Sequence, residues 1–405
     1  MEIEVVTKDY RTCIEELEQK GFKKCVDNGE DGLNRNVFTA TYTKSDLTVT
    51  VIHQVKNRLT YIVTDDVEAL SGRLFYSEDY IAGNVAGAKT TLHMRETYRA
   101  CSSYVIQLKN KHFVICDGGY LEEAPYLIHY LEQLTPEGEK PIVEGWFVTH
   151  PHHDHMELFQ TIANDASLAE RIYVEGIYMD MYDDEFAEKM NIKNLFDATR
   201  NAANILKTAG GQRTKIYRPH AGHRYYFSDI TVDVMQTMVQ MPREKWTGWR
   251  KNLNEMSAWY MFTIEGQKYL NAGDADIGAM REIMSTYDQE YLELDIMTVH
   301  HHGINVHKEF VDFIKVKTLL YPHLGIDGVY KEGQDWPGSW QASVYRNEYF
   351  HTKVEECLSF GDGTKILTFP YKVGTAVSLS PLEKYHEITG PEKERRIDYK
   401  RGGAR

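Results

Sequence analysis

The segment with the clearest chemical content is the run 149–155, which reads Thr-His-Pro-His-His-Asp-His. Imidazole nitrogens and carboxylate oxygens are the ligand atoms that zinc and related divalent metals take in proteins. In an extended loop His150 and His152 face the same side. Asp154 and His155 follow where the chain turns into a helix, and can face a second metal position. The chain has 17 histidines among 405 residues, so four in this short run are improbable by chance, and the run predicts a metal site.

The elements around this run place it at the edge of a sheet. Residues 142–148 form an apolar stretch that predicts a strand, and a helix is expected from about 157 to 163. In open α/β sheets, functional sites form where strands end. From residue 103 on, strand and helix patterns alternate, which predicts sheets covered by helices. Further strands are expected at 104–108, 113–116, 172–178, 230–236, 258–264, 268–270, 296–299 and 318–321, and further helices at 124–134, 183–191, 194–208 and 277–284.

Residues 1–70 predict a separate small α+β unit. Its helix is expected at 10–20, and its strands at 38–42, 47–55 and 59–63. No cluster of catalytic residue types falls in this unit, so we expect it to serve packing, formation of a homo-oligomer or shaping of the substrate site. After it we expect a connection over 71–97, the main α/β domain over 98–370, and a C-terminal extension over 371–405 with a flexible end.

The composition limits the binding partners and the cellular compartment that we expect. The formal net charge is −14, and an acidic surface argues against long nucleic acid and favours a small-molecule substrate. We expect no membrane association, because no apolar run approaches the length of a bilayer span and the N-terminus lacks the pattern of a signal peptide. The five cysteines are scattered without paired spacing, which predicts a reducing, cytoplasmic environment.

The residues at 150–155 match the HxHxDH motif of the metallo-β-lactamase superfamily. Three further segments resemble landmarks of that family in the same order: 103–119 its opening hairpin with an Asp-Gly end, 270–275 the strand that ends in its metal-bridging aspartate, and 295–303 the strand that ends in its last histidine ligand. The resemblance covers about residues 100–370. It implies an α/β fold of the αββα sandwich type, with a metal-dependent hydrolase domain over 98–370.

Carried over position by position, the resemblance implies a set of metal ligands. His150 and His152 would bind a first metal, Asp154 and His155 a second, and Asp274 would bridge the two. The expected cofactor is zinc, one or two ions per chain, although manganese and iron are compatible with the same ligand types.

For the last histidine ligand, the resemblance favours His301, with His302 second and His300 third. Asp117 and Thr149 are candidates for outer hydrogen bonds that hold the ligand imidazoles in place, with Asp117 also an additional candidate at the metal site.

One ligand position is left open by the resemblance. Many members of the family carry a further histidine on a loop between the first cluster and the bridging aspartate. His220 and His223 lie in that interval, but they precede the strand expected at 230–236. The position is therefore filled by His223, by Asn252 or Asn254, or it is empty, and the site is correspondingly dinuclear or mononuclear.

The activity that the resemblance implies is hydrolysis by a metal-bound hydroxide. Asp154 would orient that hydroxide or accept its proton, and His302 is the second catalytic candidate. Segment 252–257 and the His-His-Gly ending resemble the branch that contains DNA-uptake channel hydrolase domains and phosphorylcholine esterases, which favours a phosphodiester or phosphoester of a small molecule or nucleotide.

Other activities remain open at the level of the sequence. Another ester, a lactone or an amide would suit the same chemistry. A di-iron redox enzyme on the same fold is an alternative of a different class, but that class typically has glutamate where this chain has His152. A metal-free descendant that binds through its N-terminal unit is a third alternative, against which the complete ligand set argues.

Overall fold

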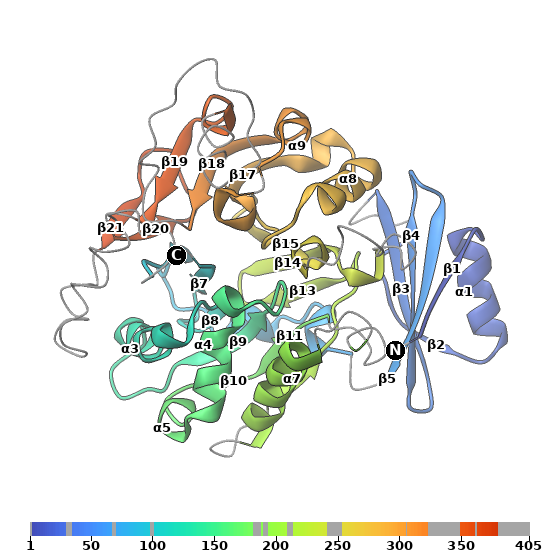
Figure 1. Cartoon of the computed structure of the whole chain (residues 1–405). Coiled ribbons are helices and arrows are strands. Elements are labelled where there is room, and N and C mark those ends of the chain that lie inside the picture. Colours follow the sequence, from blue (N-terminus) through green and yellow to red (C-terminus); the bar gives the residue numbers. More distant parts are fainter. Residues whose placement is uncertain are drawn as a thin grey trace.

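The computed structural model describes residues 2–29, 35–66, 70–97, 101–180, 188, 193–208, 214–240, 253–304, 306–322, 349–360 and 363–379. The strands of these residues form three sheets (Figure 1). One sheet belongs to the N-terminal unit, and the other two form the main body of the molecule.

The N-terminal unit is an antiparallel sheet with a helix on one face. Its elements are β1 (Glu2–Val6), α1 (Tyr10–Gln19), β2 (Lys23–Asp27), β3 (Val37–Lys44), β4 (Leu47–Gln54) and β5 (Leu59–Asp66), with strand order β1-β5-β4-β3-β2. The Asp9 side chain caps α1 by accepting a hydrogen bond from the backbone N–H of Thr12. The expected helix and three strands are present. Strands β1 and β2 were not expected, because they are edge strands without a buried residue and therefore carry little apolar pattern.

The first sheet of the main body carries the metal-motif run at one of its edges. Its strand order is β12-β11-β9-β8-β7-β6-β20-β21, and β10 also pairs with β9. Strands β8, β9, β11 and β12 are parallel, so their C-terminal ends meet at the same edge. The bounds are β6 (Thr91–Met94), β7 (Ser103–Gln107), β8 (Phe113–Asp117), β9 (Ile142–Phe147), β10 (Tyr173–Val174), β11 (Gly176–Tyr178), β12 (Lys215–Tyr217), β20 (Thr364–Thr368) and β21 (Val377–Leu379).

Helices cover the outer face of this first sheet. They are α3 (Ala124–Leu134), α4 (His153–Asn164), α5 (Ala166–Ala169) and α7 (Lys193–Thr208), preceded by the short turn η3 (Leu121–Glu123). Their apolar faces share one core with the outward side chains of the sheet, among them Phe113, Val143 and Trp146.

The second sheet of the main body is antiparallel in its first half and parallel in its second. Its strands, in sheet order, are β13 (Arg224–Phe227), β14 (Ile230–Gln236), β15 (Trp259–Ile264), β16 (Gln267–Asn271), β17 (Glu293–Thr298), β18 (Lys315–Tyr321) and β19 (Glu356–Ser359). Helices α8 (Ile277–Thr286) and α9 (Lys308–Phe313) pack on its outer face. In the described ranges, no helix combines the length and the apolar character that crossing a bilayer requires.

The inner faces of the two sheets pack on each other through aromatic side chains. The ring of Phe147 in β9 stacks on Tyr178 at 4.6 Å and meets Tyr260 of the second sheet at 5.0 Å, both between ring centroids. Val114 and Ile296, one from each sheet, belong to the same buried core. The main body is therefore four layers in the order helix, sheet, sheet, helix, which confirms the expected αββα sandwich.

The ends of the main body differ from the expected division of the chain. Strand β6 lies inside the range expected to be a connection, 71–97, and pairs with β7 and β20. The same range contains η2 (Gly72–Leu74) and α2 (Asp79–Ala82). β6 gives a weak apolar pattern because His93 is buried in it, held by a 2.6 Å hydrogen bond to the Tyr130 hydroxyl. In the C-terminal extension, β21 adds an edge to the sheet. The helix expected at 183–191 falls outside the described residues except for residue 188.

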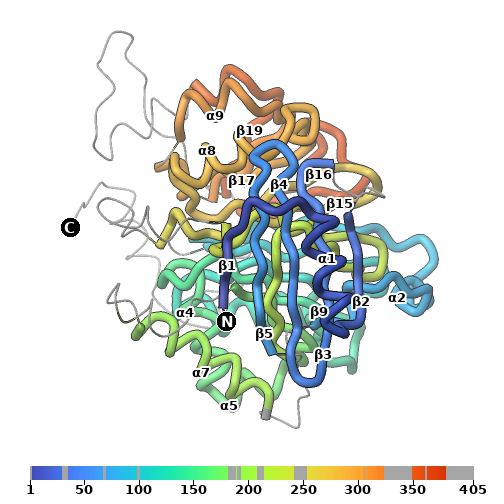
Figure 2. The backbone as a smooth tube through the Cα atoms, turned by 90° about the vertical axis from the view of Figure 1, so that its right-hand side faces the viewer, coloured from blue at the N-terminus to red at the C-terminus, as the bar shows by residue number. Residues whose placement is uncertain are grey.

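The N-terminal unit docks onto the side of the main body that carries the second sheet and α8 (Figures 1 and 2). Val37, Ile52 and Tyr61 of its sheet share a buried core with Trp259 and with Ala279 of α8. Hydrogen bonds cross the same contact. They run from Thr39 Oγ1 to the Ala221 carbonyl at 2.6 Å, from Asn28 Nδ2 to the Gly222 carbonyl at 3.0 Å, and from Gln54 Nε2 to Glu282 Oε1 at 2.9 Å.

Candidate metal centre

The metal-motif run forms the turn from β9 into α4. His152 stands immediately before the helix with an extended backbone (φ −69°, ψ 158°), and the helix begins at His153. Asp154 and His155 therefore lie in its first turn, where the helix dipole favours a carboxylate. The helix starts before the expected residue 157, because these ligand candidates themselves form its first turn.

Asp274 follows strand β16 of the second sheet, and a turn at Gly273 brings it next to the run 149–155. Gly273 follows the end of β16 with a left-handed φ of +52°, and a Cβ at this position would meet Thr149 Oγ1 at 2.6 Å. Only glycine combines this φ with so close an approach. The backbone N–H of Ala258, just before β15, also donates to the Thr149 carbonyl at 2.9 Å. The ends of the two sheets are thereby drawn together at the centre.

The histidine triplet follows β17 in the turn η9 (His300–Gly303). His301 and His302 both have left-handed backbones, with φ of 47° and 52°. The N–H of His301 donates to the Gly273 carbonyl at 3.2 Å, which ties the turn to the loop of Asp274. His300 is buried against Trp259 and Phe310, with ring centroids 5.1 and 5.0 Å away.

The side chains converge in two groups that share Asp274. The first group comprises His150, His152 and Asp274, and the second comprises Asp154, His155, His302 and Asp274; within each, the ligand atoms lie within 4.8 Å of one another. Asp274 Oδ1 lies 3.0 Å from His155 Nε2, and its Oδ2 lies 3.8 Å from His150 Nε2. The carboxylate thus stands between the two groups.

Outer hydrogen bonds fix the orientation of the imidazoles. Asp117, itself in a left-handed conformation (φ 57°), accepts hydrogen bonds from the backbone and hydroxyl of Thr149 and lies 2.8 Å from His155 Nδ1. His150 Nδ1 lies 3.2 Å from both Thr149 Oγ1 and Ser257 Oγ. These contacts leave the Nε2 atoms to face Asp274. Asp117 and Thr149 therefore lie behind the ligand candidates, as expected for outer partners.

Charges in the centre are paired. Burial raises the pKa of Asp274, but the imidazoles of His155 and His302 more than reverse this and hold the pKa well below its usual range. Burial lowers the pKa of His155, yet Asp274 and Asp117 raise it well above its usual range. Burial and then the neighbouring His155 lower the pKa of His150. The first group thus offers neutral imidazole, and in the second a divalent cation would take the place of protons.

The donor set fits a divalent metal. His155 Nε2 and Asp274 Oδ1 are buried and lie 3.0 Å apart, and among the described residues neither makes a hydrogen bond of good geometry. Buried polar atoms are ordinarily hydrogen-bonded, so two such atoms that face each other fit a shared cation. Imidazole with carboxylate suits zinc, and manganese and iron accept the same donors.

The structure distinguishes His301 from His302, the two leading candidates for the last histidine ligand. His302 belongs to the group with Asp154, and its Nε2 lies 2.9 Å from Asp154 Oδ2. His301, the favoured ligand in the sequence, is not in either compact group, although its Nε2 lies 3.5 Å from Asp274 Oδ2. Asn254, in η7 (Leu253–Met256), lies 3.3 Å from both ring nitrogens of His301. Asn252 and residues 323–348 lie outside the described residues.

His220 and His223 lie elsewhere, in a second group of polar residues that we call the interface cluster (Asp65, Asp180, Arg218, His220 and His223). His220 Nε2 lies 2.8 Å from Asp65 Oδ2, and Arg218 also binds Asp65. His223 Nε2 lies 3.0 Å from Thr41 Oγ1 of the N-terminal sheet. Neither histidine is in the metal groups. The contribution of Asp65 was not foreseen from the sequence, because it joins residues far apart along the chain.

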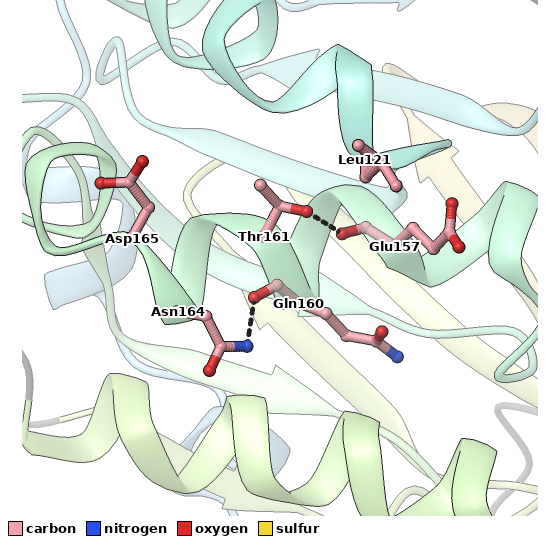
Figure 3. A pocket seen from close by; sticks show the side chains of 6 residues that line it. All are labelled: Leu121, Glu157, Gln160, Thr161, Asn164 and Asp165. Carbon is pink, nitrogen blue, oxygen red and sulfur yellow. Dashed lines mark hydrogen bonds between the residues drawn. The ribbon is translucent and has the colours of Figure 1, made fainter.

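A shallow surface hollow lies along α4, away from the residues of the two metal groups (Figure 3). Two of its polar side chains bond back to their own helix: Thr161 Oγ1 donates to the Glu157 carbonyl at 2.8 Å, and Asn164 Nδ2 to the Gln160 carbonyl at 2.7 Å. The hollow therefore shows no set of converging donors comparable with the centre.

Three comparisons with known proteins were made, of which only the comparison with solved structures found matches. No protein-family model matches the sequence, and no curated protein matches it. Solved structures with a similar fold include the metallo-β-lactamase-fold protein YhfI from Bacillus subtilis (11% identity, TM-score 0.39, 67% of this chain and 96% of that one). They also include Zn²⁺-bound PqqB from Methylobacterium extorquens (10% identity, TM-score 0.36, 63% and 84%) and a metal-dependent hydrolase of the β-lactamase superfamily (10%, 0.36, 72% and 100%). The function proposed for this chain rests on the residues of the centre.

Proposed function

We propose that this chain is a metal-dependent hydrolase of the metallo-β-lactamase type. The observation that carries the proposal is the buried Asp274 carboxylate, 2% exposed, whose two oxygens face different groups of histidines. One carboxylate between two sets of imidazoles suits a pair of divalent ions. Such ions would supply an activated water as nucleophile and would polarise the scissile bond.

The residues of the chain have distinct tasks in this proposal. Asp117 and Thr149 hold the ligand imidazoles in one orientation. Asp154 Oδ2 is the carboxylate oxygen placed to orient the attacking water and accept its proton. Asp154 and His302 were the catalytic candidates in the sequence, and in this proposal His302, whose Nε2 lies 2.9 Å from Asp154 Oδ2, serves as a ligand.

The substrate approaches from the side of Asp154 and His301. Each of these side chains is 21% exposed, whereas His155, Asp274 and His302 are 4% exposed or less. For the substrate we propose a phosphodiester or phosphoester of a small molecule or nucleotide. The resemblance of segment 252–257 supports the phosphoester, and the net charge of −14 argues for a small molecule over long nucleic acid. Carboxylic esters, lactones and amides are the competing substrates.

The test combines metal analysis with a panel of chromogenic substrates. The purified chain is assayed for bound metal and for hydrolysis of a bis-aryl phosphodiester, an aryl phosphomonoester, a phosphorylcholine ester, a lactone and a β-lactam. We expect bound metal and turnover of a phosphoester, with turnover lost and the metal content reduced in His152→Ala. The matched control is His153→Ala, because His153 is adjacent but 63% exposed and paired with Glu157. Turnover of the lactone alone would overturn the substrate class, and a chain that neither binds metal nor hydrolyses any substrate would overturn the hydrolase.

A further inference from the structure

The adjacent residues His301 and His302 present their rings to different oxygens of one carboxylate. His302 Nε2 lies 3.5 Å from Asp274 Oδ1, the oxygen that also faces His155. His301 Nε2 lies 3.5 Å from Asp274 Oδ2, the oxygen that also faces His150. The two rings are 6.1 Å apart between centroids and inclined by 66°. Consecutive residues thus point to opposite sides of Asp274.

The backbone explains how neighbouring residues can do this. Both histidines are left-handed, at φ 47°, ψ 50° and φ 52°, ψ 23°, and Gly303 follows at φ 87°. A left-handed backbone is unfavourable for residues with a Cβ and persists where the surroundings hold it. Here the N–H of His301 is bound by the Gly273 carbonyl at 3.2 Å, and the carbonyl of His301 accepts from Ile304 N–H at 2.7 Å. The strained turn is therefore fixed to the loop that carries Asp274.

The two metal groups differ in their number of donors without His301. The second group has four, from Asp154, His155, His302 and Asp274, whereas the first has three. The loop histidines that could complete the first group bind other partners, since His220 is paired with Asp65 and His223 lies against Thr41. His301 Nε2 faces the Asp274 oxygen on the side of the first group. Asn254 Nδ2 lies 3.3 Å from both ring nitrogens of His301, so the amide lies along the edge of the imidazole. With Nε2 as the ligand atom, Nδ1 is the nitrogen through which an outer polar partner would orient the ring.

We infer that His301 and His302 divide between the two metal positions: His302 completes the position of Asp154 and His155, and His301 completes that of His150 and His152 in place of a loop histidine. Each position then has four protein donors, with Asp274 common to both. The inference rests on the proposed function, because it assumes that the centre binds metal.

The test is a set of double-variant cycles read by metal binding. Co²⁺ and Zn²⁺ affinities are measured by competition titration, with the visible spectrum of bound Co²⁺ as a second readout. We expect the unsubstituted protein to bind two ions, and His301→Ala should lower the affinity for one of them at least about 10-fold. In a His152→Ala background, His301→Ala should have little further effect, whereas His302→Ala should weaken the remaining ion. In an Asp154→Ala background the two should exchange roles.

The outcomes separate this inference from the proposed function. A chain that binds no Co²⁺ or Zn²⁺ would overturn both. A chain that binds two ions equally well with and without His301, or in which His301→Ala and His302→Ala weaken the same ion, would overturn the division alone. His307→Ala is the control, because His307 is close in sequence but paired with Asp276 at 2.8 Å. Ala at 301 keeps a Cβ in the left-handed turn, so a change in binding reports on the imidazole.

Discussion

The molecule contains two buried groups of histidine and aspartate that differ in how their atoms are directed. In the metal centre, imidazoles from two segments, the run 149–155 and the turn η9, face the two oxygens of Asp274. In the interface cluster, His220 and Arg218 bind Asp65, while His223 turns to Thr41. Burial raises the pKa of Asp65, but His220 and then Arg218 more than reverse this and hold it well below its usual range. In the metal centre, ligand atoms from several side chains converge on Asp274, whereas in the interface cluster the shared carboxylate, Asp65, is already bound by His220 and Arg218.

This difference teaches that residue type and burial do not distinguish a metal site from a structural ion pair. His223 is as buried as His150, at 2% and 3% exposure, and for both burial lowers the pKa. The distinguishing property is the arrangement of several ligand atoms around one shared carboxylate. We therefore expect substitutions in the centre to change metal binding, and substitutions in the interface cluster to change stability.

The largest effect is expected at Asp274. Asp274→Asn keeps the shape of the side chain but removes the charge between the two groups. We expect loss of bound metal and a fall in hydrolysis of at least about 10²–10³-fold, the range in which single electrostatic groups of an active site contribute. Metal analysis and initial rates measure this, and circular dichroism should show an unchanged fold. Full activity in Asp274→Asn would contradict the assignment of the centre.

The next largest effect is expected at Asp65, on stability alone. Asp65→Ala would leave Arg218 and His220 without their carboxylate in a buried contact, where losing one partner costs about 3–5 kcal/mol. Urea unfolding measures the loss, and Asp66→Ala, at an exposed neighbour, should stay within about 0.5 kcal/mol of the wild type. Metal content should not change. If Asp65→Ala loses metal while remaining as stable as the wild type, the division between the two groups is wrong.

A smaller effect is expected at Gly222, where the interface cluster meets the N-terminal sheet. Gly222 has φ +86°, and a Cβ there would meet Thr39 Oγ1 at 2.0 Å. Gly266 has a similar φ of +77° with no atom within 4 Å of a Cβ. Gly266→Ala should cost about 1–2 kcal/mol from the backbone alone. Gly222→Ala should cost about 1–3 kcal/mol more, from the close contact. Equal costs in urea unfolding would mean that the two units do not pack closely at this point.

The smallest effect is expected at Asp117, which contacts the ligand candidate His155 from the outside. Asp117→Ala removes the carboxylate that lies 2.8 Å from His155 Nδ1, and outer partners of this kind change metal affinity by about 10–100-fold. Competition titration with Zn²⁺ measures the change. His93→Ala provides a comparison, because His93 is likewise buried but hydrogen-bonded to Tyr130 and Thr91. A loss of Zn²⁺ affinity in His93→Ala equal to that in Asp117→Ala would show that the effect is not specific to the centre.

The sequence predicts those parts of the molecule whose signal is local. The run at 149–155 and the strand before it are contiguous, so both the metal site and its place at a sheet edge were predictable. The alternation of strands and helices likewise led to the four-layer body. The choice among His300, His301 and His302 was not predictable, because it depends on two left-handed residues that no sequence pattern specifies.

The parts that were missed depend on contacts between distant segments. The carboxylate of Asp65 meets a histidine 155 residues further along the chain. Strand β6 has a weak pattern, and it belongs to the first sheet because β7 and β20 pair with it on either side. Such pairings are set by the packing of the whole body, which local propensity does not describe.

The core shared by the N-terminal sheet and the main body also bears on how such a chain can be inherited. Val37, Ile52 and Tyr61 are buried together with Trp259 and Met280, so removing the N-terminal unit would leave apolar surface on both pieces. Loss of the unit in evolution would therefore require compensating substitutions on the main body. A relative with the same metal motifs but without this unit must carry polar side chains on the face where Val37 and its neighbours now pack.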